Sequence, residues 1–225
     1  MKNFMGKDGF QWFIGVVEDR KDPKTLGRVR VRCLGYHTED LIKLPTKDLP
    51  WAHPMNPITS ATVSGIGQTP LGVVEGTWVV GFFTDGPTAQ QPVIMGTLPG
   101  VPKTLPTQGD TKGFQDVINA NYPKYSGESD VNRLAVNEIG AEAEEQNPHS
   151  TLTQRRATRE TAVGTAQIDG IFEGVAPIAS DLDDDNGGKW DQPAIPYSAI
   201  YPYNHVYESE SGHLREIDDT LNNER

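Results

Sequence analysis

The sequence predicts an all-β protein: a small closed or partly closed β-barrel near the N-terminus, followed by a long extended linker. Two observations support this prediction. Dense apolar patterning with the period of a β-strand is confined to roughly residues 10–97. Glycine (23) and proline (17) are plentiful, and hydrophobic residues make up only 36% of the 225 positions. A chain of this composition can bury one modest core and still leave long irregular segments.

The first two strands are predicted as a hairpin. Residues 10–17 are aromatic and β-branched, which indicates a strand buried on much of both faces. A charged turn containing Pro23 follows, and residues 27–34 then alternate strictly between two kinds of side chain. The apolar side of this second strand consists of Val29, Val31 and Cys33, and the basic side of Arg28, Arg30 and Arg32. We therefore predict a hairpin with one wet, basic face.

The rest of the barrel is less regular. Five prolines interrupt residues 36–72, which predicts a long irregular excursion without a long helix. Strand character returns in residues 73–83 and, after a turn at 85–87, in residues 91–97. Roughly four or five short strands with turn signals and no amphipathic helix indicate a small barrel.

Beyond residue 102 the pattern changes. Up to about residue 195 there is no sustained period of a strand or a helix, apart from a weak helical tendency in residues 136–145. We interpret this region as an extended linker. A short patterned tail, residues 201–219, follows it.

The charge and the single cysteine limit the classes of function. The formal net charge of −11 repels phosphate backbones and anionic lipids, so we expect neither a nucleic-acid partner nor stable membrane binding. Cys33 alone can form no intrachain disulfide, which suits assembly in a reducing cytoplasm. No apolar run suggests a signal peptide or a membrane span, so we expect a soluble protein that is not secreted by the usual route.

Candidate metal ligands and catalytic groups are weak. Asp181, Asp183 and Asp185 alternate as in the first half of a calcium loop, but Asn186 stands where that loop needs glycine and Gln192 where it needs glutamate. A solvated acidic loop is therefore the favoured interpretation.

The tail holds two histidines with acidic neighbours. On alternating strands, His205 and His213 lie too far apart to share one ion within a chain, although copies could meet on a symmetry axis. The acidic residues lie in polar loops with nothing apolar to raise a pKa, and no hydrolase or phosphate-binding motif is present. We predict no catalytic residue, no metal and no cofactor.

The arginine row of the second strand is the main candidate for binding a partner. Small barrels often bind single-stranded nucleic acid, and Trp12 and Phe13 lie nearby for stacking. Glu18, Asp19 and Asp22 flank the same hairpin, however. We therefore favour a protein partner whose carboxylates pair with Arg28, Arg30 and Arg32.

Two blocks of sequence resemble a known family. The first comprises residues 12–23 and 26–32 and continues through short matches at 49–51, 57–61, 64–67, 74–77 and 94–97. The second comprises residues 201–205, 208–213, 218–220, 224 and 225. Both are similar to the baseplate central spike protein, or cell-puncturing protein, of T-even-like contractile-tailed phages. Related needles occur in the spikes of type VI secretion systems.

The resemblance implies an OB-fold barrel, a five-stranded oligonucleotide/oligosaccharide-binding fold, and a trimeric β-helical needle. We expect the barrel in residues 1–105, a mostly irregular linker in 106–195, and a segment leading into the needle in 196–225. The family's lysozyme domain would lie between the two blocks, where this linker is too short and polar for it. The implied protein is a structural component of the virion baseplate, assembled in the host cytoplasm, and not an enzyme.

The implied partners are two further copies in a homotrimer, the baseplate hub at the end of the tail tube, and a spike-tip or needle protein. The tail carries apolar side chains with few partners in the chain, so we expect them to contact symmetry mates: Tyr201, Tyr203, Val206 and Tyr207. Two alternatives remain open: an OB-fold module that binds oligonucleotides or oligosaccharides, and a spike that retains cell-wall hydrolase activity.

Overall fold

The computed structural model describes two compact units, residues 1–130 and 131–225. The described residues are 9–107, 115–123, 126, 127, 129–132, 135, 200–210, 213–222 and 224. Weak helical character at 136–145 and the acidic loop at 181–188 were noted in the sequence, and both lie outside this set. Among the described residues, no helix has the length and apolar character to cross a membrane.

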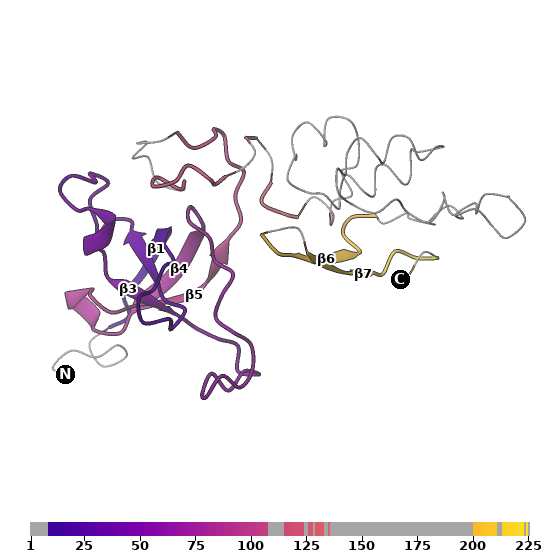
Figure 1. Cartoon of the computed structure of the whole chain (residues 1–225), viewed down its shortest axis with the longest axis horizontal. Helices are drawn as coiled ribbons and strands as arrows, with labels where there is room; N and C mark the ends of the chain where they lie inside the picture. Colours follow the sequence, from indigo (N-terminus) through magenta and orange to yellow (C-terminus); the bar gives the residue numbers. More distant parts are fainter. Residues whose placement is uncertain are drawn as a thin grey trace, which may run out of the picture. The chain divides into compact units, whose positions relative to one another are not determined.

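The first unit contains a closed five-stranded barrel (Figure 1). Its strands are β1 (Trp12–Asp19), β2 (Val29–Cys33), β3 (Trp51–Pro54), β4 (Trp78–Phe83) and β5 (Pro92–Leu98). Two short 3-10 turns, η1 (Thr46–Asp48) and η2 (Gly86–Thr88), lie in the connections. The strands close in the order β1-β2-β3-β5-β4, with β3 and β5 parallel and all other neighbours antiparallel.

The barrel prediction is confirmed, and one strand was missed. The four strands expected near residues 10–17, 27–34, 73–83 and 91–97 are present with shifted ends. The expectation that residues 36–72 are wholly irregular is wrong for β3. Only Ala52 of this strand is buried, so its four residues show no apolar alternation. Pro54 is tolerated because it lies at the end of the strand.

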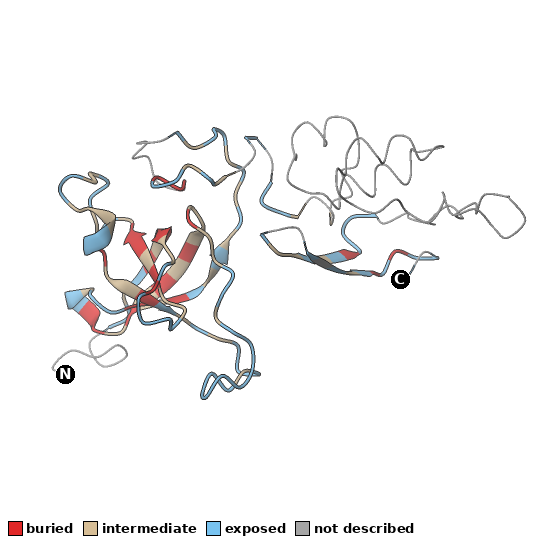
Figure 2. Ribbon diagram, in the orientation of Figure 1, coloured by how far each residue is buried: buried red, intermediate tan, exposed pale blue. Residues whose placement is uncertain are grey.

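The core of the barrel is formed by buried side chains from all five strands. These side chains are Phe13, Val17, Val29, Val31, Cys33, Ala52, Val79, Phe83 and Ile94. Figure 2 marks buried residues in red on the barrel. Gly81 permits the closest approach in this core, because a Cβ there would lie 2.2 Å from the carbonyl oxygen of Val93 and 2.6 Å from the ring of Phe13.

The second unit contains a single described hairpin of β6 (Asn204–Glu208) and β7 (Leu214–Asp218), which pair antiparallel. This hairpin lies in the tail that was expected to lead into a needle. The β-helical needle itself stays a prediction. The first compact unit runs to residue 130 and therefore continues past the expected barrel boundary at residue 105. The division into barrel, linker and needle base also stays a prediction.

Candidate partner-binding site

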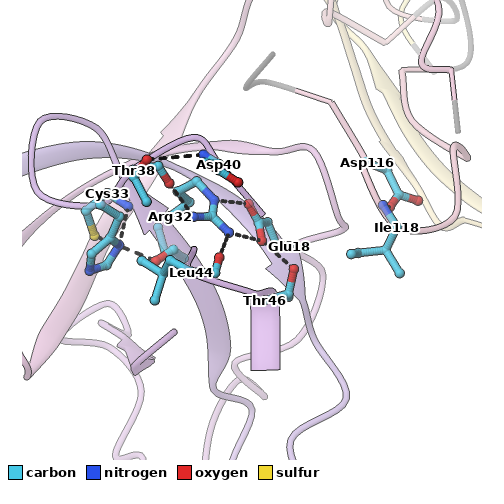
Figure 3. A network of polar contacts seen from close by, with 11 residues as sticks. Glu18, Arg32, Cys33, Thr38, Asp40, Leu44, Thr46, Asp116 and Ile118 are labelled. Carbon is cyan, nitrogen blue, oxygen red and sulfur yellow. Dashed lines mark hydrogen bonds and ion pairs between the residues drawn. The ribbon is translucent and has the colours of Figure 1, made fainter. Parts of the chain in front are cut away.

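Arg32 lies on β2 and belongs to the row that was predicted to form a wet, basic face. That expectation is wrong for this residue, which is only 4% exposed. Its guanidinium forms a forked ion pair with Glu18 at the end of β1, with Nε 2.5 Å from Oε1 and Nη2 3.1 Å from Oε2 (Figure 3). Glu18 is also 4% exposed. A planar guanidinium suits such two-point pairing with a carboxylate.

The same guanidinium anchors the loop between β2 and β3. Arg32 donates to the carbonyl oxygen of Thr38 at 2.5 Å and to that of Leu44 at 2.8 Å. The hydroxyl of Thr46 donates to Glu18 Oε2 at 2.6 Å (Figure 3). The ion pair thus holds both arms of this loop against the outside of the hairpin, which explains why an outward-facing arginine is buried.

His37 lies in the anchored loop and interacts with the end of β2. The backbone N–H of Cys33 donates to His37 Nδ1 at 3.0 Å. Burial, reinforced by the nearby cation of Arg32, lowers the pKa of His37 below its ordinary value. Burial also raises the pKa of the Cys33 thiol to about 12. The Cys33 thiol therefore stays protonated at neutral pH, and the Nδ1 lone pair of His37 is occupied by the Cys33 N–H.

Arg28 pairs with Asp22 of the β1–β2 turn. Its Nε and Nη2 lie 3.0 and 2.7 Å from the two carboxylate oxygens. Asp22 also accepts the backbone N–H groups of Lys24 and Leu26 at 2.9 and 3.0 Å. The guanidinium and then these backbone donors hold the pKa of Asp22 well below its ordinary range.

Arg30 completes the row and is also engaged within the chain. It donates to the carbonyl oxygen of Leu49 at 2.5 Å and stacks 4.4 Å from the ring centre of Trp51. Asp19, its cross-strand neighbour, lies 3.7 Å from its Nε. Each arginine of the row therefore has an acidic partner on the same hairpin. The role of this row in binding another protein stays a prediction, and such binding would compete with these internal pairs.

A different surface, which the sequence reasoning missed, exposes apolar side chains. Residues 55–72 form an arm that leaves β3 and is exposed along most of its length (Figure 2). Its exposed large apolar residues are Met55 (53%), Ile58 (102%), Val63 (62%), Ile66 (63%) and Leu71 (75%). The signal in the sequence is a run without a single ionisable residue from position 54 to 74. Exposed apolar clusters of this kind are typical of interaction surfaces.

Hydrogen bonds within the arm connect its residues to one another. The hydroxyl of Ser60 accepts the backbone N–H of Gln68 at 3.0 Å, and the side chain of Asn56 donates to Thr62 at 3.1 Å. Thr62 and Ile66 are joined by a backbone hydrogen bond of 3.1 Å. A surface that is already ordered loses less conformational entropy when a partner binds it.

Of the four tail residues expected to contact symmetry mates, Val206 and Tyr207 lie on β6, and Tyr201 and Tyr203 lie just before it. Tyr201, Tyr203 and Tyr207 are 58%, 54% and 70% exposed, and Val206 is partly buried. Ile217, which is 47% exposed, is the register partner of His205. Tyr207 lies two residues after His205 and therefore on the same face of the hairpin as Ile217. The structure thus leaves the three tyrosines uncovered, and their contact with other copies stays a prediction.

The two tail histidines are not brought together as a metal site. His205 lies opposite Ile217 on the hairpin and 3.6 Å from a carboxylate oxygen of Asp219. His213 lies at the turn, where its backbone N–H donates to the hydroxyl of Ser209. Within the part of the chain that the structure describes, no group of three metal-ligating side chains is found. The calcium-like residues Asp181, Asp183 and Asp185 lie outside that part.

A closed barrel with strand order β1-β2-β3-β5-β4 and one parallel pair defines the OB-fold class. The model of one family, the Gp5 N-terminal OB domain, matches residues 36–173, which is more than half of the chain. The chain belongs to this family.

Two curated relatives share this similarity. Protein Gp5 of Vibrio phage KVP40 is 41% identical over 244 aligned positions, which cover 99% of this chain and 53% of that protein. The pre-baseplate central spike protein Gp5 of Enterobacteria phage T4 is 42% identical over 135 positions, which cover 58% of this chain and 23% of that protein. The chain thus spans about half of the first relative's length and matches about a quarter of the second.

Proposed function

We propose that this chain is a structural component of a phage tail baseplate and forms the base of the central spike that punctures the host envelope. The observation that carries the proposal is its membership of the Gp5 OB-domain family, together with 42% identity to a protein named as the pre-baseplate central spike protein. In this proposal the protein resides in the tail baseplate of the virion.

The finer proposal is a homotrimer whose barrels sit on the baseplate hub and whose tails lead into the needle. Two uncovered apolar surfaces support it: the arm of residues 55–72 and the tyrosine-bearing hairpin. Fully burying an apolar side chain contributes roughly 1.5–3 kcal/mol, so leaving these groups in water has a substantial cost that assembly removes. A trimeric base distributes an axial load over three chains.

We further propose that the chain acts without enzymatic activity of its own. Three buried acidic side chains of the barrel form ion pairs: Glu18 with Arg32, Asp22 with Arg28, and Glu75 with Arg20 at 3.2 Å. Asp85, which is also buried, accepts the backbone N–H groups of Gln90 and Gln91. A glycosidase needs two carboxylates facing a sugar, one of them with a raised pKa, and the three paired carboxylates each face an arginine instead. The lysis of peptidoglycan by purified protein is the outcome that would contradict this part.

The decisive experiment is complementation of a phage whose own spike gene is inactivated. The full-length chain, produced with a small tag in the infected host, should restore infectious particles. The tag should then be found at the distal end of the tail tube by cryo-electron microscopy of purified tails. Recovery of infectious tails that lack the tagged chain would refute the proposal.

Sedimentation of the purified chain tests the finer statement separately. A mass of three chains at micromolar concentration is expected, and a monomer at every concentration would contradict the proposed homotrimer. Fluorescence anisotropy with a single-stranded oligonucleotide tests the alternative function, because micromolar, salt-sensitive binding would favour an OB module that binds nucleic acid.

A further inference from the structure

The chain that leaves β5 at Leu98 folds back along itself and returns to the barrel. The backbone N–H of Asp130 donates to the carbonyl oxygen of Gly100 at 2.9 Å, and that of Gly100 donates to the Asp130 carboxylate at 2.6 Å. Gly127 donates to the carbonyl oxygen of Pro102, and the Ser126 hydroxyl to that of Lys103. As the residue number rises from Gly100 to Lys103, the number of the hydrogen-bonded partner falls from Asp130 to Ser126, so the two stretches lie antiparallel.

A tight turn, residues 115–123, lies between these two stretches in the sequence. Its centre is Asp116, which is fully buried. The Asp116 carboxylate accepts the backbone N–H groups of Ile118, Asn119 and Asn121 at 3.1, 3.0 and 3.1 Å. Its own backbone N–H donates to the carbonyl oxygen of Tyr122 at 2.8 Å. One carboxylate thus satisfies three backbone donors that would otherwise be left without partners.

The turn is docked on the barrel at a glycine. Gly76 has a φ of +85°, and a Cβ there would lie 2.8 Å from the backbone nitrogen of Asp116 and 3.0 Å from the carbonyl carbon of Gln115. Gly76 itself donates its N–H to the carbonyl oxygen of Val17 in β1 at 2.8 Å. The backbone of the turn therefore rests directly on backbone that is tied to a central strand, an approach that only glycine allows.

We propose that these residues, 99–104, 115–123, 126, 127, 129 and 130, form a mechanical clip that fixes where the linker leaves the barrel. Because Asp130 lies opposite Gly100, a load on residue 131 reaches the Gly100–Asp130 pair first and opens the clip from that end. Opening it would free residues 99–130, a contour length of roughly 105–115 Å. The role of the clip rests on the proposed function. In a spike under axial load, the folded clip keeps the linker short, and the extra length is released only when the clip opens.

Force spectroscopy on the full-length chain tests the clip directly. Handles can be attached through Gln11→Cys at the edge of β1 and Val131→Cys just beyond the clip. The native Cys33 will not compete, because it is fully buried and its thiol stays protonated at neutral pH. The expected trace shows a first lengthening of about 100 Å, followed at higher force by unfolding of the barrel. A single event in which clip and barrel open together would overturn the proposal.

Matched variants connect the first event to the turn. Asp116→Ala should abolish this event or move it to clearly lower force while the barrel event stays unchanged. Asn119→Ala, which alters an exposed side chain of the same turn, should change neither event. A first event that is unaffected by Asp116→Ala would show that the lengthening arises elsewhere.

Hydrogen exchange provides a second readout that needs no handles. In Asp116→Ala, exchange at the amides of Ile118, Asn119 and Asn121 should rise by about tenfold or more, while the amide of Val17 keeps its protection. Loss of protection at Val17 as well would mean that the variant had unfolded the barrel, and Gly76→Ala then serves as the second variant. If neither variant raised exchange in the turn, the proposal would be wrong. Both tests use isolated protein, so they test the clip independently of the proposed spike function, which is tested in phage particles.

Discussion

Replacing Arg32 by leucine is expected to destabilise the barrel by about 3–5 kcal/mol, the usual cost of breaking a buried ion pair by removing one partner. The side chains of Arg32 and Glu18 are only 5% and 4% exposed, and their closest atoms lie 2.5 Å apart. Without the guanidinium, the Glu18 carboxylate stays buried with the Thr46 hydroxyl as a donor but without a cation. This cost is a large part of the roughly 5–15 kcal/mol that typically stabilises a small domain.

The double variant Arg32→Leu with Glu18→Leu isolates the interaction between the two side chains. Removing both charges leaves no unpaired ion, and such replacements are often neutral. The carbonyl oxygens of Thr38 and Leu44 lose their donor, which costs about 0.5–1.5 kcal/mol each and less where water replaces it. We therefore expect the double variant to be more stable than Arg32→Leu alone, with a coupling energy of about 2 kcal/mol or more.

Urea unfolding followed by tryptophan fluorescence measures these differences in the free energy of unfolding. Lys43→Leu is the matched control, because Lys43 pairs with Asp40 in the same loop at 3.5 Å but is 77% exposed. Its effect should stay within about 0.5 kcal/mol. A loss in the free energy of unfolding below about 1 kcal/mol for Arg32→Leu would refute the reasoning. So would a loss in the double variant that equals the sum of the losses in the two single variants. Unchanged stability with lost assembly would instead restore the arginine row as a partner-binding surface.

Three further outcomes are expected. Cys33 should resist a thiol reagent at pH 8 in the native protein and react at once in urea, and rapid native reaction would contradict its burial and raised pKa. The unfolded chain protonates His37 more readily than the folded one, so stability should be full above about pH 6.5 and fall as the pH drops below it. His37→Gln should flatten this dependence, measured by urea midpoints from pH 5 to 7.5. Tyr207→Ser should weaken self-association in sedimentation without changing the urea midpoint of the barrel, whereas an unchanged association constant would exclude this tyrosine from the interface.

Much of the barrel could be predicted from the sequence, because four of its strands are rich in aromatic and β-branched side chains, and one of them, β2, alternates strictly between valine and arginine. β3 could not be predicted in this way, since it contributes only Ala52 to the core and depends on β2 and β5 for its pairing. The clip gave no periodic signal either. It consists of backbone pairs between distant residues and one buried aspartate, and neither feature has a strand or helix period.

The arginine row shows where strand alternation stops being informative. Alternation correctly separates Val31 from Arg32 on the two sides of β2, but it does not say whether the outer side is wet. That depends on the loop between β2 and β3, whose carbonyl groups cover Arg32. The acidic partners were nevertheless readable: a hairpin turn between residues 19 and 28 brings the end of β1 opposite the arginines, and Asp19 is indeed paired with Arg30 in the register.

A row of cations beside a row of anions in one predicted hairpin should therefore be tested for internal pairing before a partner is assigned to it. In the described part of this chain the arginines pair internally, whereas the arm and the tail hairpin expose large apolar side chains. The arm holds no ionisable residue between positions 54 and 74, and the hairpin also exposes His205 and Arg215. Burial of apolar surface does not depend on a complementary charge on the partner and is little weakened by salt, unlike pairing of exposed ions. Assembly through these two surfaces should accordingly persist at high salt, which distinguishes it from assembly through the arginine row.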